Sequence, residues 1–326
     1  MRMLEVRYCI AGAAIALFGA MAAPFSVASE DVATRLDSLT STFWQVADNH
    51  YEVGKPLSPS TAFSVFEESY PSLLSLETAT INRSDLTLVE IVEALRLLHF
   101  YAQSVDSASF LVHSVKEFAR ECVDPSNADP GCNKLSKYYQ EAYDALLDTQ
   151  QFQLAEDFAA ESAGVQPLNV QASESLEVGS AALLEVRTSS DLVELFPKPV
   201  LIEANGLRVF VAVSTTCGPS LAALEWLASR AEELHSLASS IQYLSSPRDF
   251  RENVLRLAEF NQASDSIDIN VAVGRSGWPE TIWFDQTPIF FMVRDGEVVD
   301  KLVGWPSDDQ GDLLLAAVRR LALSEG

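Results

Sequence analysis

The stretch 207-LRVFVAVSTTCGPSLAALEWLASR-230 decides the fold of the second half of this chain. Residues 207–213 are apolar and rich in valine, which is typical of a buried strand, and the apolar spacing from residue 221 onward predicts a helix. A cysteine in the first turn of a helix has its thiolate favoured by unpaired backbone N–H groups and by the helix dipole. We therefore predict a reactive sulfur at Cys217. The fourth position of the motif is a serine, so the motif holds no resolving thiol.

Strand-like and helix-like segments alternate around this stretch, over residues 181–326. Asn205-Gly206 favours a two-residue hairpin turn between strands at 199–203 and 207–213, because both residues tolerate positive φ. Strands separated by helices predict an α/β layered domain. The other expected strands are 183–186, 241–244, 267–273, 289–293 and 298–303, and the other expected helices are 189–196, one opened by Pro247 and one over 308–323.

Taken in order, these elements resemble the thioredoxin superfamily. Cys217-Gly218-Pro219 opens a helix after a strand, Thr287-Pro288 precedes another strand, Asp295-Gly296 marks a hairpin turn, and Gly304 follows the closing strand. The resemblance covers about residues 181–326. It implies a thioredoxin-like mixed β-sheet domain with flanking helices.

The resemblance also implies roles for individual residues. In that family the proline is cis, and its loop faces the active-site cysteine and binds extended substrate backbone. Cys217 would be the attacking sulfur, and Ser220, one turn further on, would stabilise its thiolate by a hydrogen bond. Gly218, Pro219, Thr287, Pro288 and Gly304 would form the substrate groove, while Trp305 and Trp278 would either add apolar surface there or pack in the core.

Three positions depart from the family pattern. Thr216 stands where thioredoxins have a tryptophan, Ser220 replaces the resolving cysteine, and Val211 replaces the buried acid that serves the resolving cysteine. A dithiol cycle within the motif is therefore excluded. What remains is a reaction of one cysteine, in which Cys217 forms a mixed disulfide that another thiol must resolve.

Two functions follow from these residues. One is isomerase-like or client-retaining chemistry at Cys217 on cysteine- or disulfide-containing envelope proteins. The other is a non-catalytic binding or assembly module that keeps the fold and the groove for protein recognition, because a fold alone does not decide function. Neither function calls for a cofactor.

The N-terminus has the layout of a secretory signal peptide. Arg2 and Arg7 precede an apolar run over residues 9–23, and Ser26-Val27-Ala28 offers small residues for cleavage after Ala28. We therefore expect a periplasmic protein, the alternatives being a secreted protein or one anchored by an uncleaved signal. No later segment approaches 18 uninterrupted apolar residues, so no membrane span is expected after cleavage.

Three cysteines follow the predicted leader. Outside the cytoplasm an odd number calls for one pair and one free thiol. Cys122 and Cys132 flank a turn-rich segment, so we predict that they form a disulfide and that Cys217 stays free.

Residues 29–163 show helical periodicity without a convincing strand, which predicts an all-helical domain. Helices are expected to begin at Ser58-Pro59, at Ser84 or Asp85, and at Asp106 or Ser107, with two further helices between 134 and 163. The polar residues 164–180 are typical of a linker. Such a domain either binds another protein or serves only for packing.

The net charge of −24 argues against nucleic-acid partners, since phosphate binding depends on Lys and Arg. A metal site is not expected either. The four histidines stand singly, without a second ligand at metal spacing: His50, His99, His113 and His235.

Overall fold

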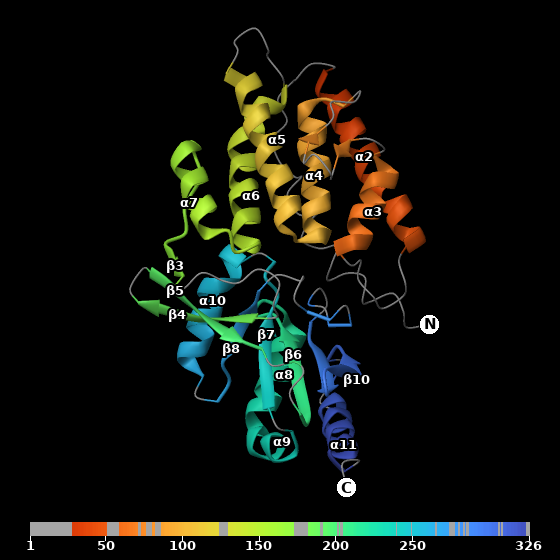
Figure 1. Cartoon of the computed structure of the whole chain (residues 1–326), viewed down its shortest axis with the longest axis vertical. Coiled ribbons are helices and arrows are strands. Elements are labelled where there is room, and N and C mark those ends of the chain that lie inside the picture. The colour runs from red at the N-terminus through yellow and green to blue at the C-terminus, as the bar shows by residue number, and fades with distance from the viewer. Residues whose placement is uncertain are drawn as a thin grey trace.

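The structure is a computed structural model, and it has an N-terminal helical region and a C-terminal mixed β-sheet with helices packed on it (Figure 1). Residues 1–27 of the predicted signal peptide lie outside the described residues. In the part of the chain that the structure describes, no helix combines the length and the apolar character needed to cross a membrane. The described residues are 28–50, 59–70, 73–75, 80–81, 86–123, 130–172, 182–189, 192–200, 202, 205–238, 240–248, 250–264, 266–273, 278–279, 281–282, 284, 287–305, 307 and 309–323.

The helical region is built from amphipathic helices whose apolar faces meet in one core. Phe43, Phe66, Leu95, Phe118 and Tyr138 come from five different helices and are each fully buried in it. Its helices are α2 (Ala28–His50), α3 (Pro59–Ser69), α4 (Leu88–Ala102), α5 (Val105–Val123), α6 (Leu135–Asp148) and α7 (Phe152–Glu161), with a 3-10 turn at Pro130–Lys134 before α6.

The start of α4 lies later than the sequence suggested. Thr87 is the N-cap: its hydroxyl accepts from the Glu90 backbone N–H, and the Glu90 carboxylate accepts from the Thr87 backbone N–H at 2.7 Å. This reciprocal pair satisfies two N–H groups that the first turn leaves unpaired. The predicted caps Ser84 and Asp85 lie outside the described residues. Helix α5 likewise begins at Val105, slightly before the predicted Asp106 or Ser107.

The expectation of a region without strands was wrong in one place. Two short strands, β1 (Leu74–Ser75) and β2 (Thr80–Ile81), pair antiparallel between α3 and α4. Each is two residues long, which is too short for an alternating pattern to show in the sequence.

The second region is organised on an eight-stranded sheet with the order β10-β9-β6-β7-β8-β4-β5-β3. Strands β6, β7 and β8 are parallel to one another, and β9 runs antiparallel to β6 and pairs with β10 as a hairpin. The strands are β3 (Val170–Ala172), β4 (Ala182–Ser189), β5 (Leu192–Pro199), β6 (Leu207–Val213), β7 (Ser240–Ser245), β8 (Ile269–Ala272), β9 (Ile289–Arg294) and β10 (Glu297–Val303).

The two faces of the sheet have different coverings. On β6, Val209, Val211 and Val213 join the core that also contains the buried side chains of the helices, whereas Phe210 and Ala212 join a smaller core with Trp278, Ile282 and Phe284. The segment that returns from β8 to β9 therefore covers the second face. The helices on the first face are α8 (Gly218–Ser229), α9 (Ala231–Leu237), α10 (Phe250–Ala263) and α11 (Asp309–Leu323).

The predicted helix over 189–196 is a strand. Residues 192–199 form β5, which pairs with the whole of β4 in an antiparallel hairpin. Val193 and Leu195 are buried and alternate with the partly exposed Glu194 and Phe196, which is the period of a strand. On its other side β5 pairs only from Val193 to Leu195, so Pro197 and Pro199 lie beyond the ladder with β3, where a proline is tolerated.

Two further expectations are corrected by the strand order. No hairpin forms across Asn205-Gly206, because the neighbours of β6 are β7 and β9, although Gly206 does have a positive φ of 91°. The predicted linker 164–180 contains β3, which is parallel to β5 and extends the sheet. This segment is therefore partly structural.

The helical region docks at the edge of the sheet where β6 and β7 end. Phe250, the first residue of α10, donates its backbone N–H to the Asp148 carboxylate of α6 and lies 5.6 Å from the Phe152 ring. Arg248, three residues after β7, donates to the Phe100 carbonyl of α4 at 2.7 Å, with its guanidinium 4.0 Å from the Phe100 ring centroid. We call these contacts the junction; the apolar residues around it belong to a single continuous core.

Candidate functional site

Cys217 stands between the end of β6 and the start of α8. It is the N-cap residue of α8, with extended backbone, and its carbonyl accepts the Leu221 backbone N–H at 3.0 Å. Pro219 fits the first turn because that turn has no use for its missing N–H. The Cys217 side chain is half-buried, whereas Gly218 and Pro219 are exposed. The sulfur thus lies at a helix N-terminus next to an accessible turn.

The Thr287-Pro288 loop faces this sulfur. The peptide bond between the two residues is cis, and the Cys217 Sγ lies 3.6 Å from the Thr287 carbonyl oxygen, within the range of a thiol hydrogen bond. The Pro288 carbonyl accepts the backbone N–H of Gly304 at 2.8 Å, and Gly304 has a positive φ of 83° that favours glycine. The structure therefore brings together Cys217, Thr287, Pro288 and Gly304, which are far apart in the sequence.

Ser220 is placed differently from the expectation. Its side chain is fully buried, and its hydroxyl oxygen accepts the backbone N–H of Ser214 at 3.2 Å. The described contacts of Ser220 include no hydrogen bond to the Cys217 sulfur. The serine therefore ties the first turn of α8 to the end of β6. From sequence spacing alone, this hydroxyl could bind either the Cys217 sulfur or the Ser214 backbone N–H.

Trp305 and Trp278 are both 6% exposed. The Trp305 ring packs against Trp226 at 5.5 Å and against Phe290 at 5.6 Å between centroids, directly after Gly304. Trp278 lies on the other face of the sheet, edge-on to Phe210. Both side chains are thus in cores, and neither forms an exposed surface beside Cys217.

The described residues at and around the two substituted positions do not supply the missing acid. Val211 is fully buried, with Phe290 and Tyr243 opposite it on the neighbouring strands. Thr216 is exposed and exchanges a hydrogen bond of 2.9 Å with the Ser214 hydroxyl. Burial raises the pKa of Tyr243 to about 12, so its phenol stays protonated at neutral pH. These described side chains are therefore neutral.

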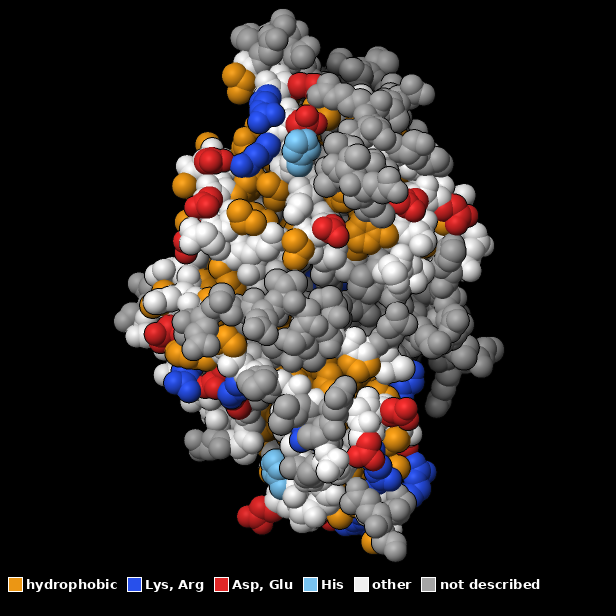
Figure 2. Space-filling view, in the orientation of Figure 1, with side chains coloured by type: hydrophobic (Ala, Val, Ile, Leu, Met, Phe, Trp, Pro, Cys, Tyr) orange, Lys and Arg blue, Asp and Glu red, His pale blue; other side chains and the backbone are white. Residues whose placement is uncertain are grey.

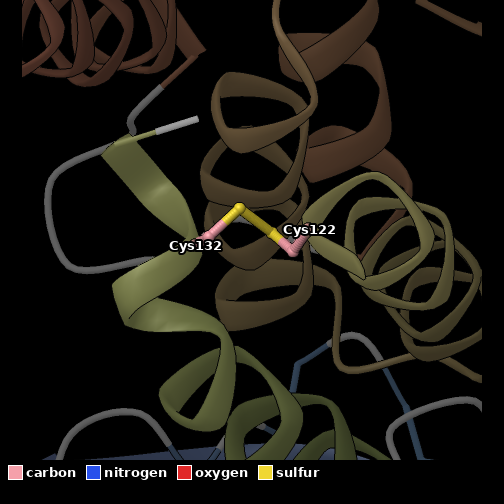
Figure 3. Close-up of a disulfide and its surroundings, with 2 residues drawn as sticks. All are labelled: Cys122 and Cys132. Carbon is pink, nitrogen blue, oxygen red and sulfur yellow. A yellow bond between two sulfur atoms is a disulfide. The ribbon is translucent and has the colours of Figure 1, made fainter. Parts of the chain in front are cut away.

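The predicted disulfide is present. Cys122 at the end of α5 and Cys132 in the 3-10 turn are bonded to each other (Figure 3). Among the described cysteines, Cys217 is free. Within the described ranges, no group of three or more His, Cys, Asp or Glu side chains is arranged to hold a metal ion. His99 is buried, with its Nδ1 2.9 Å from the Ser107 hydroxyl, while His113 and His235 are exposed.

No sequence pattern predicted that the helical region would pack near Cys217. The junction places Phe100 and Arg248 at the edge of the sheet from which the Cys217 loop also leaves. A single signal was available: Phe100-Tyr101 sit together at the end of a helix whose other large side chains follow one face. Which element they would meet could not be read from that pattern.

No known protein family and no curated protein matches the chain. Among solved structures, the chain is similar to the crystal structure of a thioredoxin-like protein from Bacteroides caccae, with a TM-score of 0.26 and 10% identity over 71% of this chain and 78% of that one. The fold class is an N-terminal helical region followed by a mixed β-sheet with flanking helices, as its own strand order and connections define.

Proposed function

We propose that this protein uses the single thiol of Cys217 to form mixed disulfides with cysteine- or disulfide-containing proteins of the cell envelope. The observation that supports this best is the Cys217 sulfur at the N-terminus of α8, 3.6 Å from the carbonyl of the Thr287-Pro288 loop. A client backbone lying along that loop would present its own sulfur to Cys217. The leader-like N-terminus and the Cys122–Cys132 disulfide both fit an oxidising compartment, for which we propose the periplasm.

The chemistry is a thiol–disulfide exchange. The Cys217 thiolate attacks one sulfur of a client disulfide, the client S–S bond breaks as the new one forms, and the released client thiolate takes a proton from water. A second client thiolate then attacks the mixed disulfide, a new client disulfide forms, and Cys217 leaves as the thiolate. The client is isomerised without net oxidation or reduction. Because α8 has no second cysteine, a mixed disulfide that meets no client thiol persists and retains the client.

The test is the refolding of a model protein with scrambled disulfides in a redox buffer of reduced and oxidised glutathione. The chain should raise the rate of native disulfide formation, and Cys217→Ser should abolish the gain. Acid quenching and alkylation should trap a Cys217–client disulfide in the native chain. If native disulfides form at the same rate with the native chain and with Cys217→Ser, the proposal is wrong.

A second candidate is a non-catalytic binding or assembly module with a helical protein-interaction region. The hydrogen bond that the Ser220 hydroxyl accepts from the Ser214 backbone N–H favours it, because this serine then has a structural role without any thiol chemistry. For this candidate, Cys217→Ser should leave the capture of envelope partners unchanged. Partners that are recovered only by the Cys217-containing chain, and that are released by a reducing agent, would rule the module out.

A further inference from the structure

Three aromatic rings form a row on the surface of the helical region beside the junction. Trp44 of α2 lies 5.5 Å from Tyr101 of α4, and Tyr101 lies 4.9 Å from Phe100, all between ring centroids and all edge to face. Trp44 and Phe100 are each 44% exposed, although they are large apolar side chains. Contiguous exposed apolar groups of this kind mark interaction sites more often than isolated ones do. We call Trp44, Tyr101 and Phe100 the ring row.

The ring row is continuous with the edge of the sheet that carries Cys217. Phe100 lies under the guanidinium of Arg248, which follows β7 by three residues. In the parallel pair of β6 and β7, Val213 is opposite Ser245, so the loop to Cys217 and the loop to Arg248 leave the sheet at the same edge. A polypeptide that has its sulfur at Cys217 and extends toward the helical region would therefore approach the ring row.

The charges around Trp44 select the chemistry of the occupant. Asp37 and Asp48 stand seven residues before and four residues after Trp44 on α2, hence on the same face, and both are exposed. Among the described side chains of α2 these are the charged ones. The whole chain carries a net charge of −24, and Figure 2 shows both acidic and basic side chains over both regions on the face in view. A cationic occupant is favoured there.

We propose that the ring row is the docking surface for the client polypeptide, and that it selects segments in which apolar side chains are flanked by Lys or Arg. The proposal rests on the proposed thiol function for the identity of the occupant as a client. Docking at the ring row would raise the effective concentration of the client sulfur at Cys217. The aromatic rings supply the apolar contact area, and Asp37 and Asp48 supply the charge preference.

The test separates docking from thiol chemistry by removing every reacting sulfur. The chain with Cys217→Ser is titrated with a fluorescein-labelled, cysteine-free peptide that has a Leu/Phe centre flanked by lysines, and binding is read by anisotropy. Trp44→Ser should weaken binding about tenfold, as truncation of an aromatic anchor does. The matched control is Leu154→Ser, which removes an apolar side chain 54% exposed on α7 and should leave the affinity unchanged.

A second variant keeps the rings and changes only the charge. Asp48→Lys should weaken binding of the lysine-flanked peptide and strengthen binding of its glutamate-flanked counterpart. Equal affinities for the two peptides, equal losses with Trp44→Ser and Leu154→Ser, or self-association of the chain that Trp44→Ser abolishes would each overturn the proposal. Neither the Cys217→Ser chain nor the peptide has a reacting thiol in this assay. A negative binding result would therefore not bear on the exchange activity of the native chain, which the refolding assay tests separately.

Discussion

The Asp148 carboxylate of α6 accepts a hydrogen bond of 2.9 Å from the backbone N–H of Phe250, the first residue of α10, in a buried position. The two residues are 102 positions apart. A helix N-terminus leaves its first N–H groups without partners inside the helix, and here another part of the chain supplies the acceptor. The bond therefore fixes the helical region to the sheet at one defined point.

Replacing this acceptor should weaken the junction. Asp148→Ala is expected to lower the free energy of unfolding by about 1–2 kcal/mol, because it leaves the Phe250 N–H buried and unpaired. Asp148→Asn, which keeps an oxygen acceptor, should cost less. Urea unfolding measures both, with Asp157→Ala as the control because Asp157 is exposed on α7. If the alanine variants at 148 and 157 are equally stable, the junction does not depend on this bond.

His99 should make the stability depend on pH. Burial, and to a lesser extent the positive charge of Arg248, lower the pKa of His99 from 6.5 to about 4. The unfolded chain then binds a proton at a higher pH than the folded chain does. The contribution to stability is fully present above pH 6.5 and is lost as the pH falls toward 4, by roughly 3 kcal/mol in total.

The measurement compares the native chain with His99→Gln in urea unfolding at several pH values between 4 and 7. The variant should lose less stability across this window, because glutamine binds no proton. His113→Gln is the control, since the His113 side chain is 60% exposed. Parallel pH profiles for the native chain and His99→Gln would show that the pKa of His99 is the same in the folded and the unfolded chain.

Most helices and strands could be predicted from local apolar patterns, and the elements that were predicted wrongly have physical causes. The helices from α3 to α7 and the strands from β6 to β10 follow apolar periodicities long enough to be read. Residues 192–196, by contrast, place apolar side chains both at alternate positions and three residues apart, so a short helix and a strand fit equally well until β4 is present as a partner. A three-residue strand such as β3 has no pattern of its own.

The candidate site was predicted in its members but not in all of its contacts. The resemblance placed Cys217, Thr287, Pro288 and Gly304 in one groove, and the structure brings these four together. The partner of Ser220 depends on where the end of β6 lies relative to α8, which spacing along one helix does not determine. The junction joins residues as far apart as Phe100 and Arg248, and only the folded chain brings them into contact.

The Cys122–Cys132 disulfide should stabilise the helical region. The two cysteines are ten residues apart. Closing a loop of this length lowers the entropy of the unfolded chain, which in the loop-entropy account stabilises the folded chain by about 2–3 kcal/mol. The paired variant Cys122→Ser with Cys132→Ser is expected to lose about that much stability in urea unfolding. Peptide mapping of the unreduced native chain supplies the check, and a native disulfide containing Cys217 would contradict the assignment.

Close packing between α8 and α11 requires glycine at position 311. A Cβ atom added at Gly311 would overlap Cε2 of Trp226, whose ring is packed against Trp305. Gly311→Ala should therefore displace the indole and lower the free energy of unfolding by about 1–3 kcal/mol. Gly218→Ala is the matched control, because a Cβ there meets nothing within 4 Å, and its stability should stay within about 0.5 kcal/mol of the native chain.

A double-mutant cycle identifies Trp226 as the cause of this loss. Trp226→Leu removes the atoms that the new Cβ would meet, so Gly311→Ala should cost less in the Trp226→Leu background than in the native one. Because Trp226 and Trp305 are in contact, the displacement should also change tryptophan fluorescence in Gly311→Ala and not in Gly218→Ala. Additive losses in the cycle would mean that the strain lies in the α11 backbone and not in the contact with the Trp226 indole.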